Sequence, residues 1–390
     1  MRSARRPARL TPRRRPRTWA AAAGIALLAG TLTACGGDSE ATGSADAAPS
    51  SAAGDELATA MKPLDAYPVP TEKLDKVDSL AGRTIFYIPI TKQAPQFTTT
   101  EKTLTAAAEA AGLRVQVCDG KGTPTDIGGC IGQATDAGAA AVIADAIPYK
   151  LAGNGLDAAQ KAGIPVVISN QVPDPAHPAS KTLTWVPVPG GEQQVRLFDW
   201  ITADSRGKAN ILINQSSDGP SPAAYVAEGR ATLEKNCPNC KLTVNQVTSS
   251  NFALIPSSTS AALLKDPAIT YVDSQFEQYL QPTQGGVQQA SRTDIKVVTG
   301  SVSLGGMKAV KSGSLAAATA QAAAYQGWVN TDAALRLILG QPVPEYTIPT
   351  RLFTKDNIGD VELTEEAELS GEWFGPAGFS EDFKKLWGIA

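Results

Sequence analysis

From residue 83 onward, short runs of apolar and β-branched residues alternate with longer Ala-rich stretches. The first run, residues 84–88, predicts a buried strand, and a helix over 104–111 is expected behind a capping box of Thr98 and Glu101. The pattern then repeats, with strands predicted at 114–118, 140–144 and 165–169 and helices ending near Ala137 and at Gly163. Strands that alternate with helices in this way are typical of a parallel α/β sheet.

A Pro/Gly-rich segment at 186–191 separates this set from a second one and is the predicted hinge. Beyond it the pattern predicts helices at 192–204 and 223–235 and strands at 209–214, 242–247, 269–273 and 295–299. Two α/β sets of similar size imply two lobes, each a layered structure with its own sheet. Ligands in such folds bind beyond the carboxyl ends of the strands, so site residues are expected there.

The first 34 residues differ from the rest, with eight arginines, no carboxylate and an apolar stretch at 20–32. That stretch is only about half of the roughly 20 residues that a membrane-spanning helix needs. It ends in Leu32-Thr33-Ala34-Cys35, which resembles a bacterial lipobox, so residues 1–34 are predicted to be a signal peptide and Cys35 to be lipidated. An uncleaved short anchor helix is the alternative. Residues 35–60, rich in Ala, Gly, Ser and Asp, are then a flexible tether, and 61–82 a lead-in segment.

Composition narrows the range of partners. Without the eight N-terminal arginines the chain carries 27 basic and 38 acidic side chains, and such an acidic surface repels phosphate backbones. Nucleic-acid binding is therefore disfavoured. With 43% apolar residues, the 390-residue chain can bury one large core or two medium-sized ones.

The mature chain keeps four further cysteines, and an even number outside the cytoplasm predicts two local disulfides, Cys118 with Cys130 and Cys237 with Cys240. A thioredoxin-like redox function is the alternative for the second pair. That motif opens a helix after a strand, whereas this pair follows a predicted helix. A zinc site would need two more thiolates or imidazoles, so no metal and no cofactor are expected.

Signatures of catalysis are weak. His177 is the single histidine, in the proline-rich loop 174–178, and residues 301–305 come near a nucleophile elbow but lack its first glycine. The sequence contains no dinucleotide fingerprint and no phosphate loop. The chain is therefore predicted not to be an enzyme, and a hydrolase that uses Ser303 with His177 is the alternative.

Several stretches resemble, in their order and spacing, the type I periplasmic solute-binding proteins of ABC importers, the ribose-binding-protein-like group. They are residues 82–89, 131–144, 162–167 and 318–321, within a likeness that covers about residues 80–358. The resemblance implies two Rossmann-like lobes with parallel sheets, joined by three crossovers. It assigns residues 83–187 and 322–345 to the N-terminal lobe, 188–321 and 346–358 to the C-terminal lobe, and 359–390 to a C-terminal extension.

The same resemblance implies which strand-end residues meet the ligand. Gln96 and Phe97 stand where sugar-binding members often carry Asn-Pro-Phe-Phe, and Asn170 and Gln171 replace an aspartate-arginine pair. Tyr225 lies close to a position where an arginine is expected. The implied ligand-binding set also contains Asp273, Gln275 and Gln321. The competing interpretation is that the aromatic rings belong to the cores and that Asn170 and Gln171 shape a turn.

A site of amides, hydroxyls and aromatic rings with one carboxylate suits a neutral or cationic ligand with an apolar face, and the predicted ligand is a small neutral polar or partly aromatic solute of the sugar-like class. The resemblance implies that the lobes close on this solute and deliver it to an ABC permease, while Cys35 anchors the protein to the outer face of the cell membrane. The expected partners are thus a small-molecule solute, a permease and, through the lipid, the membrane. A ligand-sensing lipoprotein that signals to a membrane receptor or kinase is the alternative.

Overall fold

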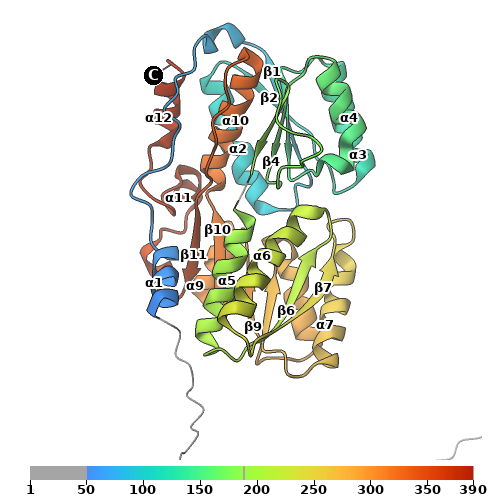
Figure 1. Cartoon of the computed structure of the whole chain (residues 1–390), viewed down its shortest axis with the longest axis vertical. Helices are drawn as coiled ribbons and strands as arrows, with labels where there is room; N and C mark the ends of the chain where they lie inside the picture. Colours follow the sequence, from blue (N-terminus) through green and yellow to red (C-terminus); the bar gives the residue numbers. More distant parts are fainter. Residues whose placement is uncertain (1–50, 188, 390) are drawn as a thin grey trace, which may run out of the picture. The chain divides into compact units, whose positions relative to one another are not determined.

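The computed structural model describes residues 51–187 and 189–389. The predicted signal peptide, Cys35 and most of the predicted tether lie outside these residues. Two β-sheets with helices packed on them make up most of the described chain (Figure 1). None of the helices in these residues combines the length and the apolar character needed to cross a membrane.

The N-terminal lobe holds a five-stranded parallel sheet. Its elements are β1 (Thr84–Pro89), α2 (Pro95–Ala110), β2 (Arg114–Val117), α3 (Pro124–Asp136), β3 (Ala141–Asp145), α4 (Tyr149–Lys161), β4 (Val166–Ser169), β5 (Leu183–Val186) and α10 (Ala323–Leu339). The strand order is β2-β1-β3-β4-β5. Successive side chains of a strand point to opposite faces, so Ile85 and Tyr87 join the core with α2 and α10, whereas Phe86 and Ile88 join the core with α3 and α4.

The C-terminal lobe holds a six-stranded sheet. Its elements are α5 (Gly190–Asp204), β6 (Asn210–Ser216), α6 (Pro220–Asn236), β7 (Lys241–Val247), α7 (Ile255–Lys265), β8 (Tyr271–Ser274), α8 (Leu280–Gln289), β9 (Lys296–Thr299), α9 (Leu304–Ser312), β10 (Ala317–Gln321) and β11 (Thr350–Thr354). The strand order is β11-β10-β9-β8-β6-β7, and only the β10–β11 pair is antiparallel. Phe198 of α5 and Val226 of α6 pack in one core of this lobe, and Leu263 of α7 packs in another.

The chain passes between the lobes three times, from β5 to α5, from β10 to α10, and from α10 back to β11. Two α/β lobes with mostly parallel sheets confirm the fold class predicted from the sequence. The parallel strands of each sheet all run in the same direction, so their carboxyl ends and the N-termini of the helices that follow them gather at one edge of the sheet.

Residues 61–82 and the C-terminal extension pack against each other. The Leu64 N–H donates to the Phe374 carbonyl over 2.6 Å, and the Leu74 N–H donates to the Leu386 carbonyl over 2.9 Å. The extension forms α11 (Glu365–Ser370) and α12 (Phe379–Leu386). Its aromatic side chains are all buried, namely Trp373, Phe374, Phe379, Phe383 and Trp387. The extension is therefore docked on the protein and leaves no exposed aromatic patch.

The structure corrects three local predictions. The prediction of a flexible tether is wrong for residues 51–60. These residues form α1 (Ser51–Ala60), because Leu57 and Ala60 pack on apolar residues of α5. The prediction of a capping box is also wrong. Helix α2 begins at Pro95, whose ring favours the first helical position, so Thr98 lies inside the helix. The third correction is β5, a strand that the sequence pattern does not predict because its four residues follow a long polar loop.

Both predicted disulfides are present. Cys118 and Cys130 join the end of β2 to α3, with their Cα atoms 5.7 Å apart. Cys237 and Cys240 join the end of α6 to the residue before β7, with a Cα separation of 5.3 Å. Each bond therefore ties a helix to its neighbouring strand.

Candidate ligand-binding site

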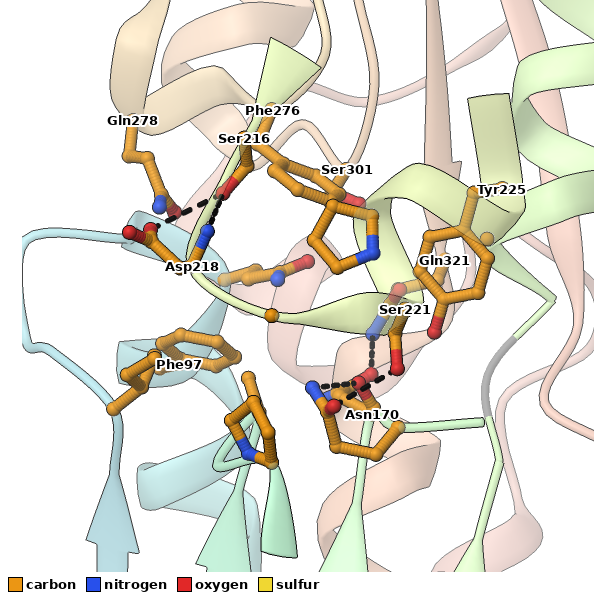
Figure 2. Close-up of a pocket in the computed structure, with 18 of the residues that line it drawn as sticks. Phe97, Asn170, Ser216, Asp218, Ser221, Tyr225, Phe276, Gln278, Ser301 and Gln321 are labelled. Carbon is orange, nitrogen blue, oxygen red and sulfur yellow. Dashed lines mark hydrogen bonds between the residues drawn. The ribbon is translucent and has the colours of Figure 1, made fainter. Parts of the chain in front are cut away.

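A cavity of about 60 Å³ lies between the two lobes, at the carboxyl ends of their strands (Figure 2). Segments that follow β1, β3 and β4 line it from the N-terminal lobe, and segments that follow β6 and β8 line it from the C-terminal lobe. The lining residues are Ile90, Gln96, Phe97, Ala146, Pro148, Asn170, Gln171, Gly190, Gln193, Ser216, Asp218, Gly219, Ser221, Pro222, Tyr225, Phe276, Gln278, Ser301 and Gln321.

Two aromatic rings face the cavity from opposite lobes. Phe97 comes from the first turn of α2 and Phe276 from the segment after β8 (Figure 2). Phe97 is 3% exposed and also belongs to the core of its lobe, so it is a structural as well as a lining residue. Pro148 and Pro222 add further apolar surface. The cavity therefore offers flat apolar walls on both sides.

Asn170 is held by a buried carboxylate at the end of β3. Its Nδ2 donates to Asp145 Oδ1 over 2.5 Å, while the Tyr87 hydroxyl donates to Asp145 Oδ2 over 2.6 Å. Asn170 has a φ of 57°, a left-handed conformation that asparagine adopts more readily than most residues. Burial raises the pKa of Asp145, and these hydrogen bonds oppose that effect. The carboxylate thereby fixes the direction of the Asn170 amide at the cavity wall.

A chain of amides runs from this point into the C-terminal lobe. Gln321 Nε2 donates to Asn170 Oδ1 over 3.0 Å, and Gln321 Oε1 accepts from Gln193 Nε2 over 3.2 Å. Gln193 Oε1 in turn accepts from the Ser301 N–H over 3.0 Å. Gln321 ends β10, after which the chain crosses to the N-terminal lobe, so this network spans a crossover and orients the lining amides on both sides.

The rim of the cavity is closed by direct contact between the lobes. The Ser221 hydroxyl donates to Gln171 Oε1 over 2.8 Å and accepts from the Val172 N–H over 3.0 Å. Pro148 packs on Gly219, where a Cβ would lie 2.4 Å from the proline Cγ, so only glycine permits this approach. The lobes are therefore in a closed arrangement.

Two lining residues present buried polar atoms without a hydrogen-bond partner among the described residues, the Tyr225 hydroxyl and Gln96 Oε1. Tyr225 is 6% exposed, and its ring lies against Gly190, where a Cβ would come within 2.4 Å of it. A buried polar atom left unpaired costs free energy that a bound solute can recover. Tyr225 and Gln96 are therefore the lining groups best placed to bond a ligand.

Asp218 is the one charged side chain among the lining residues, and the sequence prediction did not include it. Its carboxylate accepts from Tyr279 (2.7 Å), Thr248 (2.6 Å) and the Ser249 N–H (3.0 Å). Asp218 comes two residues after the end of β6, so the strand-end rule used for the other candidates would have found it. Its bonds hold the loop after β7 against the site.

Six of the predicted ligand-binding residues line this cavity, namely Gln96, Phe97, Asn170, Gln171, Tyr225 and Gln321, whereas Asp273 and Gln275 do not. Asp273 is fully buried on the face covered by α5, where Gln194 Nε2 donates to its Oδ2 over 2.6 Å and burial raises its pKa to about 7. Gln275 bonds the Ser216 N–H (2.7 Å) and the Pro222 carbonyl (2.8 Å), so it shapes the wall from behind.

The residues considered for catalysis do not meet. Ser303 donates its hydroxyl to Glu277 over 2.7 Å, and His177 stacks on Tyr149 with Nδ1 3.0 Å from Asp174 Oδ2. Neither Ser303 nor His177 lines the cavity between the lobes. Within residues 51–187 and 189–389, no group of three or more histidine, cysteine, aspartate or glutamate side chains is arranged to hold a metal ion.

Comparison with known proteins gives one family and many structures of the same fold. Residues 85–342 match the family described as periplasmic binding protein domain. The 5-methylthioribose transporter solute-binding protein from Thermotoga lettingae has a TM-score of 0.66 and 18% identity, over 78% of this chain and 96% of that one. A Mycobacterium smegmatis protein in complex with β-D-fucofuranose has a TM-score of 0.64 and 20% identity, over 74% and 96%.

A third structure is the periplasmic binding protein of the arabinose ABC transporter from Shewanella sp. ANA-3, bound to α- and β-L-arabinofuranose. Its TM-score is 0.61 and its identity 18%, over 71% of this chain and 93% of that one. A search of curated protein sequences finds no match. Identities this low show a shared fold and leave the ligand to be argued from the site itself.

Proposed function

The chain belongs to the periplasmic binding protein domain family, and on that premise we propose that it captures an uncharged, sugar-like solute between its lobes and delivers it to an ABC permease. The observation that carries this proposal is the composition of the cavity wall. The lining residues include no lysine, arginine or histidine, and their single carboxylate, Asp218, already accepts hydrogen bonds from four neighbours, Ser216, Thr248, Ser249 and Tyr279.

An anionic solute would lose its hydration in this cavity without gaining a cationic partner, which is costly. A sugar-like solute fits better because its C–H face packs on aromatic rings such as Phe97 and Phe276, while its hydroxyl groups pair with amides and hydroxyls.

The contacts at the rim of the cavity imply movement of the lobes. The Ser221 hydroxyl bonds both Gln171 and the Val172 N–H of the opposite lobe, and Pro148 packs on Gly219. A sugar therefore enters only after the lobes separate and the Gln171–Ser221 contact breaks. The lobes then close around it, in the hinged binding mode known for two-lobed proteins.

The proposed location outside the cytoplasm rests on the lipobox-like residues 32–35. Cys35 carries the lipid that anchors the mature chain to the outer face of the cell membrane, although Cys35 lies outside the described residues. Expression of a Cys35→Ser variant in the native host tests this point. The variant should appear in the medium or the soluble extracytoplasmic fraction, and retention in the membrane fraction would contradict the anchor.

Titration calorimetry on the mature chain with Cys35→Ser tests the binding proposal. The panel contains L-arabinose, D-galactose, D-fucose, 5-methylthioribose, neutral polyols and, as the charged counterpart, aldonates. At least one neutral solute should bind, and Tyr225→Phe should weaken that solute about tenfold because it removes one hydroxyl and keeps the ring. Asp174→Asn, outside the cavity, is the matched control. Binding of aldonates alone would refute the proposed ligand class.

A further inference from the structure

One carboxylate oxygen of the C-terminal extension is bonded to both lobes. Glu368 Oε1, on α11, accepts from the Thr99 hydroxyl of α2 over 3.0 Å and from the Leu304 N–H, at the first residue of α9, over 3.2 Å. Thr99 belongs to the N-terminal lobe and Leu304 to the C-terminal lobe. Glu368 lies beyond residues 85–342, so this contact is an addition to the part of the chain that matches the family.

The extension that carries Glu368 is fixed to each lobe separately. Trp387 donates its Nε1–H to Asp332 Oδ1 over 2.7 Å and stacks on Trp328 of α10, with ring centroids 5.4 Å apart. On the other lobe, Arg351 of β11 donates to the Trp373 carbonyl over 2.6 Å. Because both attachments are buried, α11 cannot swing away freely when the lobes move.

The bond to Leu304 has no replacement within the helix it caps. The first N–H groups of an α-helix lack intrahelical partners. Glu277 takes the Ser303 and Gly306 N–H groups at the start of α9, over 2.7 and 2.6 Å, and Glu368 takes that of Leu304. Separation of α2 from α9 therefore breaks either the Thr99 bond or the Leu304 bond, and the released group loses a charged partner.

We propose that the C-terminal extension is a latch in which Glu368 holds the two lobes in the closed arrangement. The latch lowers the fraction of open molecules and so slows the entry and release of a solute. The inference rests on the proposed function only in the sense that closure serves capture. Its test needs no solute, so its failure is separate from a failure of the binding proposal.

Pulsed electron spin resonance between one label on each lobe measures the open fraction directly. Gln133→Cys on α3 and Lys265→Cys on α7 are exposed sites for the labels, and the four native cysteines in the described chain are paired as disulfides. The mature chain carries Cys35→Ser throughout. Without solute, Glu368→Ala and Thr99→Val should each raise the long-distance population about tenfold, since each removes a charge-assisted hydrogen bond between the lobes.

Two comparisons decide between a latch and a merely structural role. Thr99→Val removes the bond to the N-terminal lobe and keeps the Glu368 bond to Leu304. If Glu368→Ala opens the protein and Thr99→Val does not, Glu368 acts only as a cap of α9, and the bridging role is wrong. Glu366→Ala, exposed on the same helix, should leave the distances unchanged. Distance distributions identical to the parent protein in both Glu368→Ala and Thr99→Val would refute the latch. If Glu368→Ala does not fold, Thr99→Val decides alone.

Discussion

Gln171 of the N-terminal lobe and Ser221 of the C-terminal lobe are joined by a hydrogen bond of 2.8 Å, donated by the serine hydroxyl. The same hydroxyl accepts the Val172 N–H, so one side chain satisfies two groups of the opposite lobe. These bonds form only when the lobes are together, and they sit at the rim through which a solute passes. Their removal therefore changes the closed state more than it changes either lobe.

Ser221→Ala should speed the dissociation of a bound solute. The variant leaves Gln171 Oε1 and the Val172 N–H without their partner, and a lost hydrogen bond of this kind is worth about 1 kcal/mol, or roughly fivefold in rate. Stopped-flow fluorescence measures the rate. Ser257→Ala, exposed on α7, is the control and should leave it unchanged. An unchanged rate in Ser221→Ala would mean that the rim contact does not limit release.

Phe276→Leu should weaken solute binding by roughly three- to tenfold, because a flat ring that packs on the solute is worth about 0.5–1.5 kcal/mol beyond its area. Phe276 is preferred to Phe97 because Phe97 is a fully buried core residue, whereas Phe276 is only partly buried where it packs on its core. The control is Phe252→Leu, whose ring packs on Tyr279 at 5.5 Å and lies outside the cavity lining. Calorimetry that finds equal affinity in both variants would contradict the stacking role.

Asp273→Asn should make the protein more stable at pH 8 and have little effect at pH 4. Burial raises the pKa of Asp273 from 3.8 to about 7, so between these values the folded state binds more protons than the unfolded state. The contribution of Asp273 to the free energy of unfolding therefore falls as the pH rises from about 4 to about 7. Asparagine stays neutral and keeps an oxygen for Gln194. Urea unfolding should show a gain of roughly 2–4 kcal/mol at pH 8.

The matched control is Asp356→Asn, which makes the same substitution at an exposed position. A gain for Asp273→Asn that is the same at pH 4 and pH 8 would show that packing rather than ionisation is responsible.

The two disulfides should contribute unequally to stability. Cys118 and Cys130 are separated by 12 positions and Cys237 and Cys240 by 3, and in the chain-entropy model the longer loop constrains the unfolded chain more. Replacing the first pair by serine should lower the free energy of unfolding by about 3 kcal/mol, and the second by about 1.6 kcal/mol. Denaturant unfolding measures both, and a larger loss for the second pair would contradict the entropic account.

Most of the fold follows from local pattern. The run at 84–88 alternates between two cores, as expected for a strand buried on both faces, and the cysteine spacings place each pair within reach. The strand-end residues that the family resemblance implied include Asn170 and Gln321, which do line the cavity. These features depend on neighbours within a few residues, so they are legible in the sequence.

The resemblance failed for Asp273 because a match in strand position does not say which face of the strand end borders the cavity. Residues alternate between faces, and α5 covers the face on which Asp273 lies. The position of α5 is set by its packing on α6 and on the sheet, not by residues near 273. Helix α1 escaped prediction for a similar reason, since its apolar residues need the surface of α5.

The sequence by itself determined the two α/β sets and the disulfide pairs, because each is a property of a short stretch of chain. Only the tertiary structure decided that Gln171 meets Ser221, that Asp218 joins the site, and that Thr99 bonds Glu368, 269 positions away. Such contacts arise when separate elements pack together, and no local propensity encodes the distance between them.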